Sequence, residues 1–164
     1  MMGNIKIKRN SLGDTRTATR VPSISEFNQA NNMHREDVKK MMDNMADLIK
    51  DSGISHDRTK VFEPYRSTFY RELCATIEGK MNFEEGEWYP FHCESERHHL
   101  DRSCPEDVNL LDVIEMICDC VCAGMARSGS VRPITINSEL LQKAVANTVD
   151  LCKGSVILEG NEDV

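Results

Sequence analysis

The chain has 164 residues, of which 40% are hydrophobic and 29% are charged, and its formal net charge is −7 at pH 7. A chain of this length suits one domain that buries about two-thirds of the surface exposed by its unfolded form. No apolar run approaches the roughly 20 residues of a membrane span, and the first residues lack the apolar segment of a secretory signal. The acidic balance opposes long-range attraction to nucleic acid or anionic lipid. We therefore expect a cytoplasmic protein without a membrane or nucleic-acid partner.

Composition divides the chain into three segments. Residues 1–26 mix basic side chains with Ser, Thr, Asn and Gly and show little periodicity, which predicts an extended or partly disordered arm with one short strand at IKIK. Residues 27–154 carry helical periodicity and form the predicted domain. Residues 155–164 form a C-terminal tail with a second short strand and an acidic end. The predicted fold class is mainly all-α, with short strands near both termini.

The helical segment contains four predicted helices. In the first, apolar residues recur at steps of three and four from Val38 to Ile49, and Gly53 ends the pattern. His34 lies one turn before Val38 on the same face. The other helices are expected at residues 64–78, at residues 108–127 and from Ser138 to Gly154. Residues 79–104 are predicted to be a loop, and a connection of that length inside a compact domain is either functional or wrongly assigned.

Seven cysteines are present, and none of them has the C-x-x-C spacing that is typical of a zinc or redox site. Three of them alternate in the sequence CDCVC, within the helix predicted at residues 108–127. Side chains two residues apart on a helix point about 200° apart and cannot chelate one ion. We therefore expect seven reduced thiols that pack as small hydrophobic side chains.

The helix predicted at residues 108–127 is apolar around most of its circumference. Its exceptions, Asp112, Glu115 and Asp119, fall within a stripe about 60° wide. We expect such a helix to be buried on most sides, where a carboxylate without a partner costs several kcal/mol or becomes protonated, and a metal ion removes that cost. The alternative is that the stripe is simply the hydrated side of a helix whose other sides pack.

The five histidines occur in a suggestive order. His34 is followed by His56, directly before Asp57, then by His92 and by the adjacent pair His98 and His99. Each of these has an ordinary structural explanation by itself, such as a surface turn or a solvated loop. Followed by carboxylates on an apolar helix, they predict one shared metal site. Imidazole and carboxylate ligands suit Mn, Fe, Co, Zn or Mg, as one or two ions.

This order resembles the HD-domain superfamily of metal-dependent phosphohydrolases, helical bundles that hold a metal with a His, a His-Asp doublet and a later Asp. The chain is also similar to a family of unknown function, common in phages and bacteria, with a helix-borne His and the motifs HDxSK, WxxxH, HH and EMxxDW. The matching residues are His34, HDRTK at 56–60, WYPFH at 88–92, HH at 98–99 and EMICDC at 115–120. Thr59 stands for the usual Ser, and Cys120 stands for the usual Trp. The resemblance covers about residues 30–130 and implies an HD-like helical bundle.

The resemblance also implies roles for these residues. The primary metal ion would be held by His34, His56, Asp57 and Asp119, and a second ion by His92 with His98 or His99. Glu115 is the candidate for holding or deprotonating the attacking water. Lys60 is the first candidate for binding the phosphate, followed by Arg58 and Arg97, and the alternative for Lys60 is an ordinary solvated lysine.

The predicted function is hydrolysis of a nucleotide or another small phosphate ester by metal-activated water. A small pocket in a chain of this size suits such a substrate better than a polymer. Two alternatives remain open, namely a di-iron oxygenase on an HD-like scaffold and a non-catalytic module that binds a nucleotide or a protein. Helical domains of this size often form homodimers, but the sequence leaves the oligomeric state open, and a phage origin would place the protein in the host cytoplasm.

Overall fold

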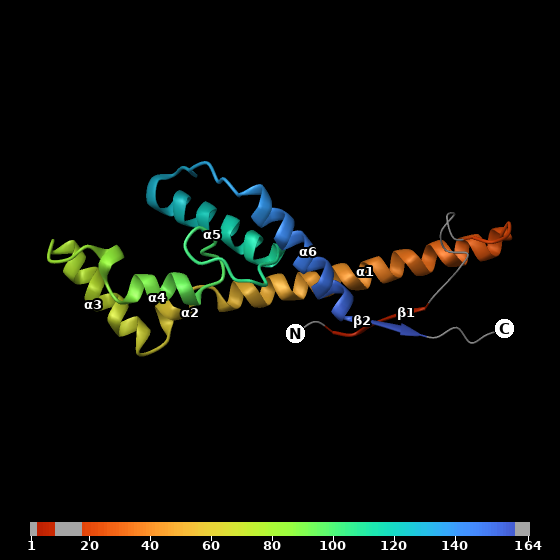
Figure 1. Cartoon of the computed structure of the whole chain (residues 1–164), viewed down its shortest axis with the longest axis horizontal. Coiled ribbons are helices and arrows are strands. Elements are labelled where there is room, and N and C mark those ends of the chain that lie inside the picture. The colour runs from red at the N-terminus through yellow and green to blue at the C-terminus, as the bar shows by residue number, and fades with distance from the viewer. Residues whose placement is uncertain (1–2, 9–17, 160–164) are drawn as a thin grey trace. The chain divides into compact units, whose positions relative to one another are not determined.

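The computed structural model describes residues 3–8 and 18–159, so part of the basic arm and the acidic end of the tail lie outside the described residues. The described chain is mainly helical with two short parallel strands, which confirms the predicted fold class (Figure 1). In chain order the elements are β1 (Ile5–Lys8), α1 (Ile24–Ser55), α2 (Arg58–Val61), α3 (Tyr65–Ile77), the 3₁₀ helix η1 (Phe83–Glu85), α4 (Trp88–Ser95), α5 (Leu110–Ser128), α6 (Ser138–Gly154) and β2 (Val156–Glu159). Within the described residues, none of the helices combines the length and the apolar character needed to cross a bilayer.

The described residues form two compact units. The first contains residues 3–8, 18–48 and 149–159, and the second contains residues 49–148. All residues predicted to form the metal site belong to the second unit, except His34.

The first unit contains the two strands and most of α1. The strands pair in parallel, with Ile5 opposite Val156 and Lys8 opposite Glu159. Ile5 is buried, and its N–H group donates to the carbonyl oxygen of Ser155 over 2.8 Å. The two predicted strands are therefore confirmed, and they form one sheet with each other.

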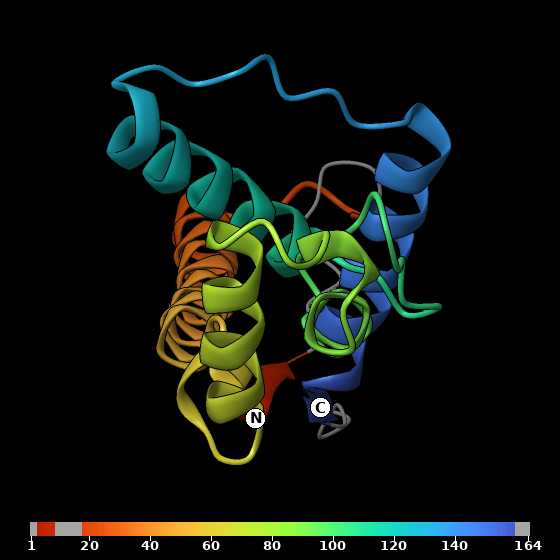
Figure 2. The same cartoon turned by 90° about the vertical axis from the view of Figure 1, so that its left-hand side faces the viewer.

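The core of the second unit lies where α5 and α6 meet the segment that follows α4. Its buried residues are Leu100, Val108, Val113 and Ala144, and the partly buried Leu110, Met116, Ile136 and Leu140 pack against them. Val108 and Ala144 are fully buried. Between α5 and α6 the chain runs as an extended segment (Figure 2).

The start of α5 is fixed by a capping box. The side chain of Asn109 accepts a hydrogen bond from the N–H group of Leu111, and Asp112 accepts one from the N–H group of Asn109, both over 2.9 Å. Arg97 binds the same Asp112 carboxylate through two donors, at 2.7 and 2.8 Å. Asp112 is thus a capping and pairing residue, which explains the first acid of the predicted stripe without a metal.

The prediction that α5 is buried on most sides is wrong. Only Asp112 and Val113 are buried within this helix, whereas Ile117, Val121 and Met125 are exposed. The reason is that α5 packs on the core only through the face that carries Val113 and Met116. All seven cysteines are free thiols, but Cys104, Cys118 and Cys122 are exposed rather than packed.

Part of the predicted loop at residues 79–104 is helical. The helix α4 escapes the sequence pattern because it has only eight residues and carries Pro90 in its first turn, where a missing N–H group is tolerated. Its N-terminus is held by the buried Glu72 of α3, which accepts hydrogen bonds from the N–H groups of Glu87 and Trp88 at 3.1 and 3.0 Å. Gly86 is required there, since a Cβ atom at that position would collide with the Glu72 carboxylate.

Candidate metal centre

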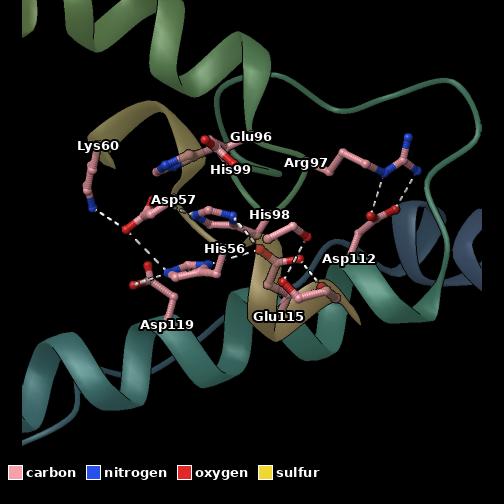
Figure 3. A network of polar contacts seen from close by, with 12 residues as sticks. His56, Asp57, Lys60, Glu96, Arg97, His98, His99, Asp112, Glu115 and Asp119 are labelled. Carbon is pink, nitrogen blue, oxygen red and sulfur yellow. Dashed lines mark hydrogen bonds and ion pairs between the residues drawn. The ribbon is translucent and has the colours of Figure 1, made fainter. Parts of the chain in front are cut away.

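The His56–Asp57 doublet lies in the turn between α1 and α2. Asp57 has a left-handed backbone, with φ 55° and ψ 36°, which Asp and Asn tolerate better than most residues. In Figure 3 its carboxylate lies between Lys60 and the imidazole rings. Although burial raises it, the hydrogen bond from Lys60 and the charges around the carboxylate hold the pKa of Asp57 below its ordinary value. Asp57 is therefore an ionised, partly buried acceptor at the centre of the cluster.

Three imidazoles present their Nε2 atoms to the Asp57 carboxylate. The distances are 3.3 Å from His56, 3.4 Å from His92 and 3.8 Å from His98. His99 joins the group through its own Nε2 atom, which lies 2.9 Å from that of His92. Histidines from three separate parts of the chain therefore converge on one acid.

Glu115 of α5 holds two of these rings from the other side. Its Oε1 atom lies 2.9 Å from Nδ1 of His56 and 3.0 Å from Nδ1 of His98, while Ser52 of α1 donates to Oε2. Although burial raises it, these contacts lower the pKa of Glu115 to about 2. Because the carboxylate takes up the Nδ1 sides, the two Nε2 atoms are directed toward Asp57 (Figure 3).

His92 is oriented by a separate hydrogen-bond relay. The Thr59 hydroxyl donates to Oε1 of the buried Glu96 over 2.9 Å, and the Thr59 N–H group donates to the same atom. Nδ1 of His92 lies 2.5 Å from the Thr59 oxygen. Because the hydroxyl proton is directed to Glu96, His92 must be the donor in this second contact, with its proton on Nδ1. The relay therefore leaves the Nε2 lone pair of His92 free to bind a cation.

The residues present fit a divalent metal ion. Within the described part of the chain, three groups of side chains have potential ligand atoms that all lie within 4.8 Å of one another: Asp57, His92, His98 and His99; His56, Asp57 and Asp119; and His56, His98 and Glu115. Oδ1 of Asp57, a buried atom at the centre of the cluster, has no hydrogen-bond partner among the described residues. Nitrogens bound at about 2.1 Å to one ion lie about 3 Å apart when at right angles, close to the 2.9 Å between His92 and His99.

Burial sets the protonation states of the rings. It lowers the pKa of His92 to about 3, with a further decrease from the neighbouring His99. Burial, followed by the charge of His98, also lowers the pKa of His99. For His98 burial acts in the same direction, but the Glu115 carboxylate outweighs it and raises the pKa. His92 and His99 are consequently neutral at neutral pH, as metal ligation requires.

Three cavities border the cluster, and Asp119 lines each of them. The cationic cavity, of about 490 Å³, is lined by His98, His99, Asp119, Arg127 and Arg132 among others. The aromatic cavity, of about 440 Å³, is lined by Lys60, Phe69, Phe83, Trp88, His92 and Arg127 among others. The apolar cavity, of about 220 Å³, is lined by Ile49, His56, Leu111, Ile114 and Glu115 among others. A small molecule in any of these cavities would border residues of the cluster.

Not every predicted site residue lies in the cluster. His34 is exposed in the third turn of the 32-residue helix α1, in the first unit, and it is absent from the three candidate groups found among the described residues. The prediction of His34 rested on its helical stripe and on the family resemblance, and periodicity does not give the neighbours of a helix face. Arg97 is bound to Asp112 and Asp107, so it is already paired (Figure 3). Arg58 is exposed, with its guanidinium over the ring of Phe62 at 5.2 Å.

Sequence reasoning missed the residues that orient the ligands. Thr59 was treated only as a substitute for Ser within the motif, although a hydroxyl at this position is the feature shared by both residues. Glu96 and Ser52 carry no sequence signal that distinguishes them from other polar residues. Arg127 and Arg132, on either side of Gly129, belong to none of the sequence motifs.

The described structure thus defines a mainly helical protein whose second unit contains clustered His, Asp and Glu residues that could hold a metal ion. The model of a family of unknown function, DUF5662, matches residues 23–151 of the chain. The chain therefore belongs to this family. Neither a curated protein nor a solved structure matches it.

Proposed function

We propose that the protein is a metal-dependent phosphohydrolase that acts on a nucleotide or another small phosphate ester. The observation that carries the proposal is the convergence of imidazole Nε2 atoms on Asp57, at 3.3 to 3.8 Å, next to cavities that contain cationic side chains. Metal-binding groups beside a cationic pocket suit a phosphate, whose charge both can neutralise. The order of the motifs, which resembles that of HD-domain phosphohydrolases, supports the same reaction class.

Two ions fit the arrangement, with Asp57 common to both. One would be held by His56, Asp57 and Asp119, and the other by Asp57 with His92, His98 and His99. Mn, Fe, Co, Zn and Mg remain the candidates, and the four imidazoles favour Mn, Fe, Co or Zn over Mg. Such ions supply water with a lowered pKa and neutralise the phosphoryl oxygens. In the hydrolysis the water oxygen bonds to phosphorus, the ester P–O bond breaks, water loses a proton and the leaving oxygen gains one.

The surrounding side chains have distinct roles in this proposal. Glu115 positions His56 and His98, because both of its oxygens are engaged and its pKa of about 2 makes it a weak base at neutral pH. We therefore prefer this positioning role to the earlier candidate role of removing a proton from water. Lys60 donates to Asp57 and lines the aromatic cavity, so its ammonium group would meet a phosphoryl oxygen that enters there.

The test is a hydrolysis assay on protein purified without a histidine tag and loaded with Mn, Co, Zn or Mg. A panel of nucleotides and simple phosphate esters should include a substrate from which phosphate is released or a phosphodiester is opened. Asp57→Asn should abolish this activity, because Asn suits the left-handed backbone while removing the carboxylate charge. His34→Ala, in the first unit, should leave the activity unchanged.

Two other results would replace the proposal. Bound iron together with oxygen consumption, and no hydrolysis of any phosphate ester, would favour the di-iron oxygenase. Tight binding of a nucleotide without turnover, in protein that retains its metal, would favour the binding module.

A further inference from the structure

We infer that the substrate carries at least two linked phosphoryl groups, and that Arg127 and Arg132 bind the phosphoryl group that is not hydrolysed. This inference rests on the proposed function. Both arginines line the cationic cavity together with His98, His99 and Asp119 of the cluster. If one phosphoryl group lies at the metal centre, Arg127 and Arg132 are therefore the side chains available to bind a second phosphoryl group.

These two arginines have no partner among the residues that the structure describes. Within the described residues, neither Arg127 nor Arg132 forms a hydrogen bond or an ion pair, whereas Arg97 binds Asp112 through two donors. An unpaired guanidinium group has five N–H donors in a planar fork, which matches the oxygens of a phosphate. Because the protein has a net charge of −7, two positive side chains without an acidic partner beside the metal centre favour the binding of an anion there.

The acids near these arginines have other partners. Asp101 also lines the cationic cavity, but its carboxylate lies 3.9 Å from the guanidinium of Arg102. Asp119 belongs to a candidate metal group with His56 and Asp57. A bound ion would neutralise part of the Asp119 charge, leaving the arginines as the main charges facing the cavity.

The backbone brings the two arginines together. Arg127 lies in the last turn of α5, which ends at Gly129 with φ 68°. The extended segment that follows packs directly on α5, because a Cβ atom at Gly124 would lie only 2.7 Å from the carbonyl oxygen of Ser130. Gly124 thus permits the close approach of the segment that carries Arg132, which lines the same cavity.

One of the two arginines lines a second cavity. Arg127 also lines the aromatic cavity, together with Lys60, His92 and His99. A substrate with a single phosphate would use the metal centre and Lys60 alone, so the arginines would contribute little to its binding. A diphosphate group has a second set of phosphoryl oxygens for the arginines, which gives a role to the cations of both cavities.

The experiment measures binding of inorganic pyrophosphate and of inorganic phosphate to metal-loaded protein by calorimetry. Each of Arg127→Gln and Arg132→Gln should weaken pyrophosphate binding by about 10- to 100-fold, the usual range for a charged hydrogen bond, and leave phosphate binding within about twofold. Arg127→Lys should recover part of the loss. Arg35→Gln, at an exposed arginine of α1 that lines neither cavity, is the matched control.

The same variants separate this inference from the proposed function. If a substrate is turned over, the two Gln variants should raise KM for a nucleoside diphosphate with little change in kcat, and leave KM for the monophosphate unchanged. Selective loss of pyrophosphate binding in a protein that hydrolyses nothing would support the arginine subsite and refute the hydrolase. Equal effects on phosphate and pyrophosphate, or no effect on either, would overturn the subsite while leaving hydrolysis a separate question.

Discussion

Replacing Thr59 with Val tests how the metal centre is held together. Thr59 is buried, and its oxygen links Nδ1 of His92, at 2.5 Å, to the carboxylate of Glu96, at 2.9 Å. Val has nearly the same shape as Thr, so the variant removes the hydroxyl without creating a cavity. Thr59→Ser keeps the hydroxyl and is therefore the matched control.

The expected magnitude follows from the burial of these groups. The substitution leaves the Nδ1 proton of the buried His92 without an acceptor, at a cost of about 1 to 3 kcal/mol. Loss of the group that orients a metal-bound imidazole typically weakens metal binding by about 10- to 100-fold. That range corresponds to about 1.4 to 2.7 kcal/mol of metal-binding free energy.

The assay is a competition titration of Mn or Zn between the protein and a chelating indicator. Thr59→Val should bind the ion about 10- to 100-fold more weakly than the wild type, and Thr59→Ser should stay within a few-fold. Thermal denaturation of both metal-free variants checks that each is folded. Equal metal affinity in the Val and Ser variants would refute the role of the relay.

Three further predictions concern the groups around the centre. Arg97→Ala should lower the free energy of unfolding by about 2 kcal/mol in chemical denaturation, since it leaves the buried Asp112 carboxylate without its charged partner. The control Arg102→Ala, which removes an exposed ion pair, should change this free energy by less than about 0.5 kcal/mol. Glu115→Gln should weaken metal binding at least as much as Thr59→Val in the same titration, because Glu115 holds the Nδ1 sides of two rings; an unchanged affinity would contradict its positioning role. In the metal-free protein the Glu115 carboxylate raises the pKa of His98, so protons should compete with the ion at His98 and metal affinity should fall as the pH is lowered from about 8 to about 6; a pH-independent affinity would show that His98 is no ligand.

The part of the centre that could be predicted from the sequence is the part carried by compact motifs. His56 and Asp57 are adjacent, and Glu115 and Asp119 are four residues apart on a helix, so each pair shares a location whatever the tertiary fold. The structure brings both pairs together with His92, His98 and His99. The chain has only five histidines, so their positions in the motifs pointed to a shared site.

The part that could not be predicted depends on tertiary contacts. Membership of His34 in the site was argued from a helical stripe, and periodicity gives the face of a helix but not the neighbours of that face. The same limitation produced the wrong burial for α5, whose Ile117 and Val121 are exposed. Helix α4 was hidden because its start depends on Glu72, a partner from another helix.

The most direct measurement is the metal content of the wild-type protein and of Asp57→Asn, both purified without a histidine tag, incubated with Mn, Fe, Co or Zn, and dialysed. Convergence of Asp57 with His56, His92, His98 and His99 predicts one or two divalent ions per wild-type chain, and a marked loss in the variant. A wild-type chain that retains no ion under any of these conditions, or a variant that retains as many ions as the wild type, would contradict the assignment of this cluster as a metal centre.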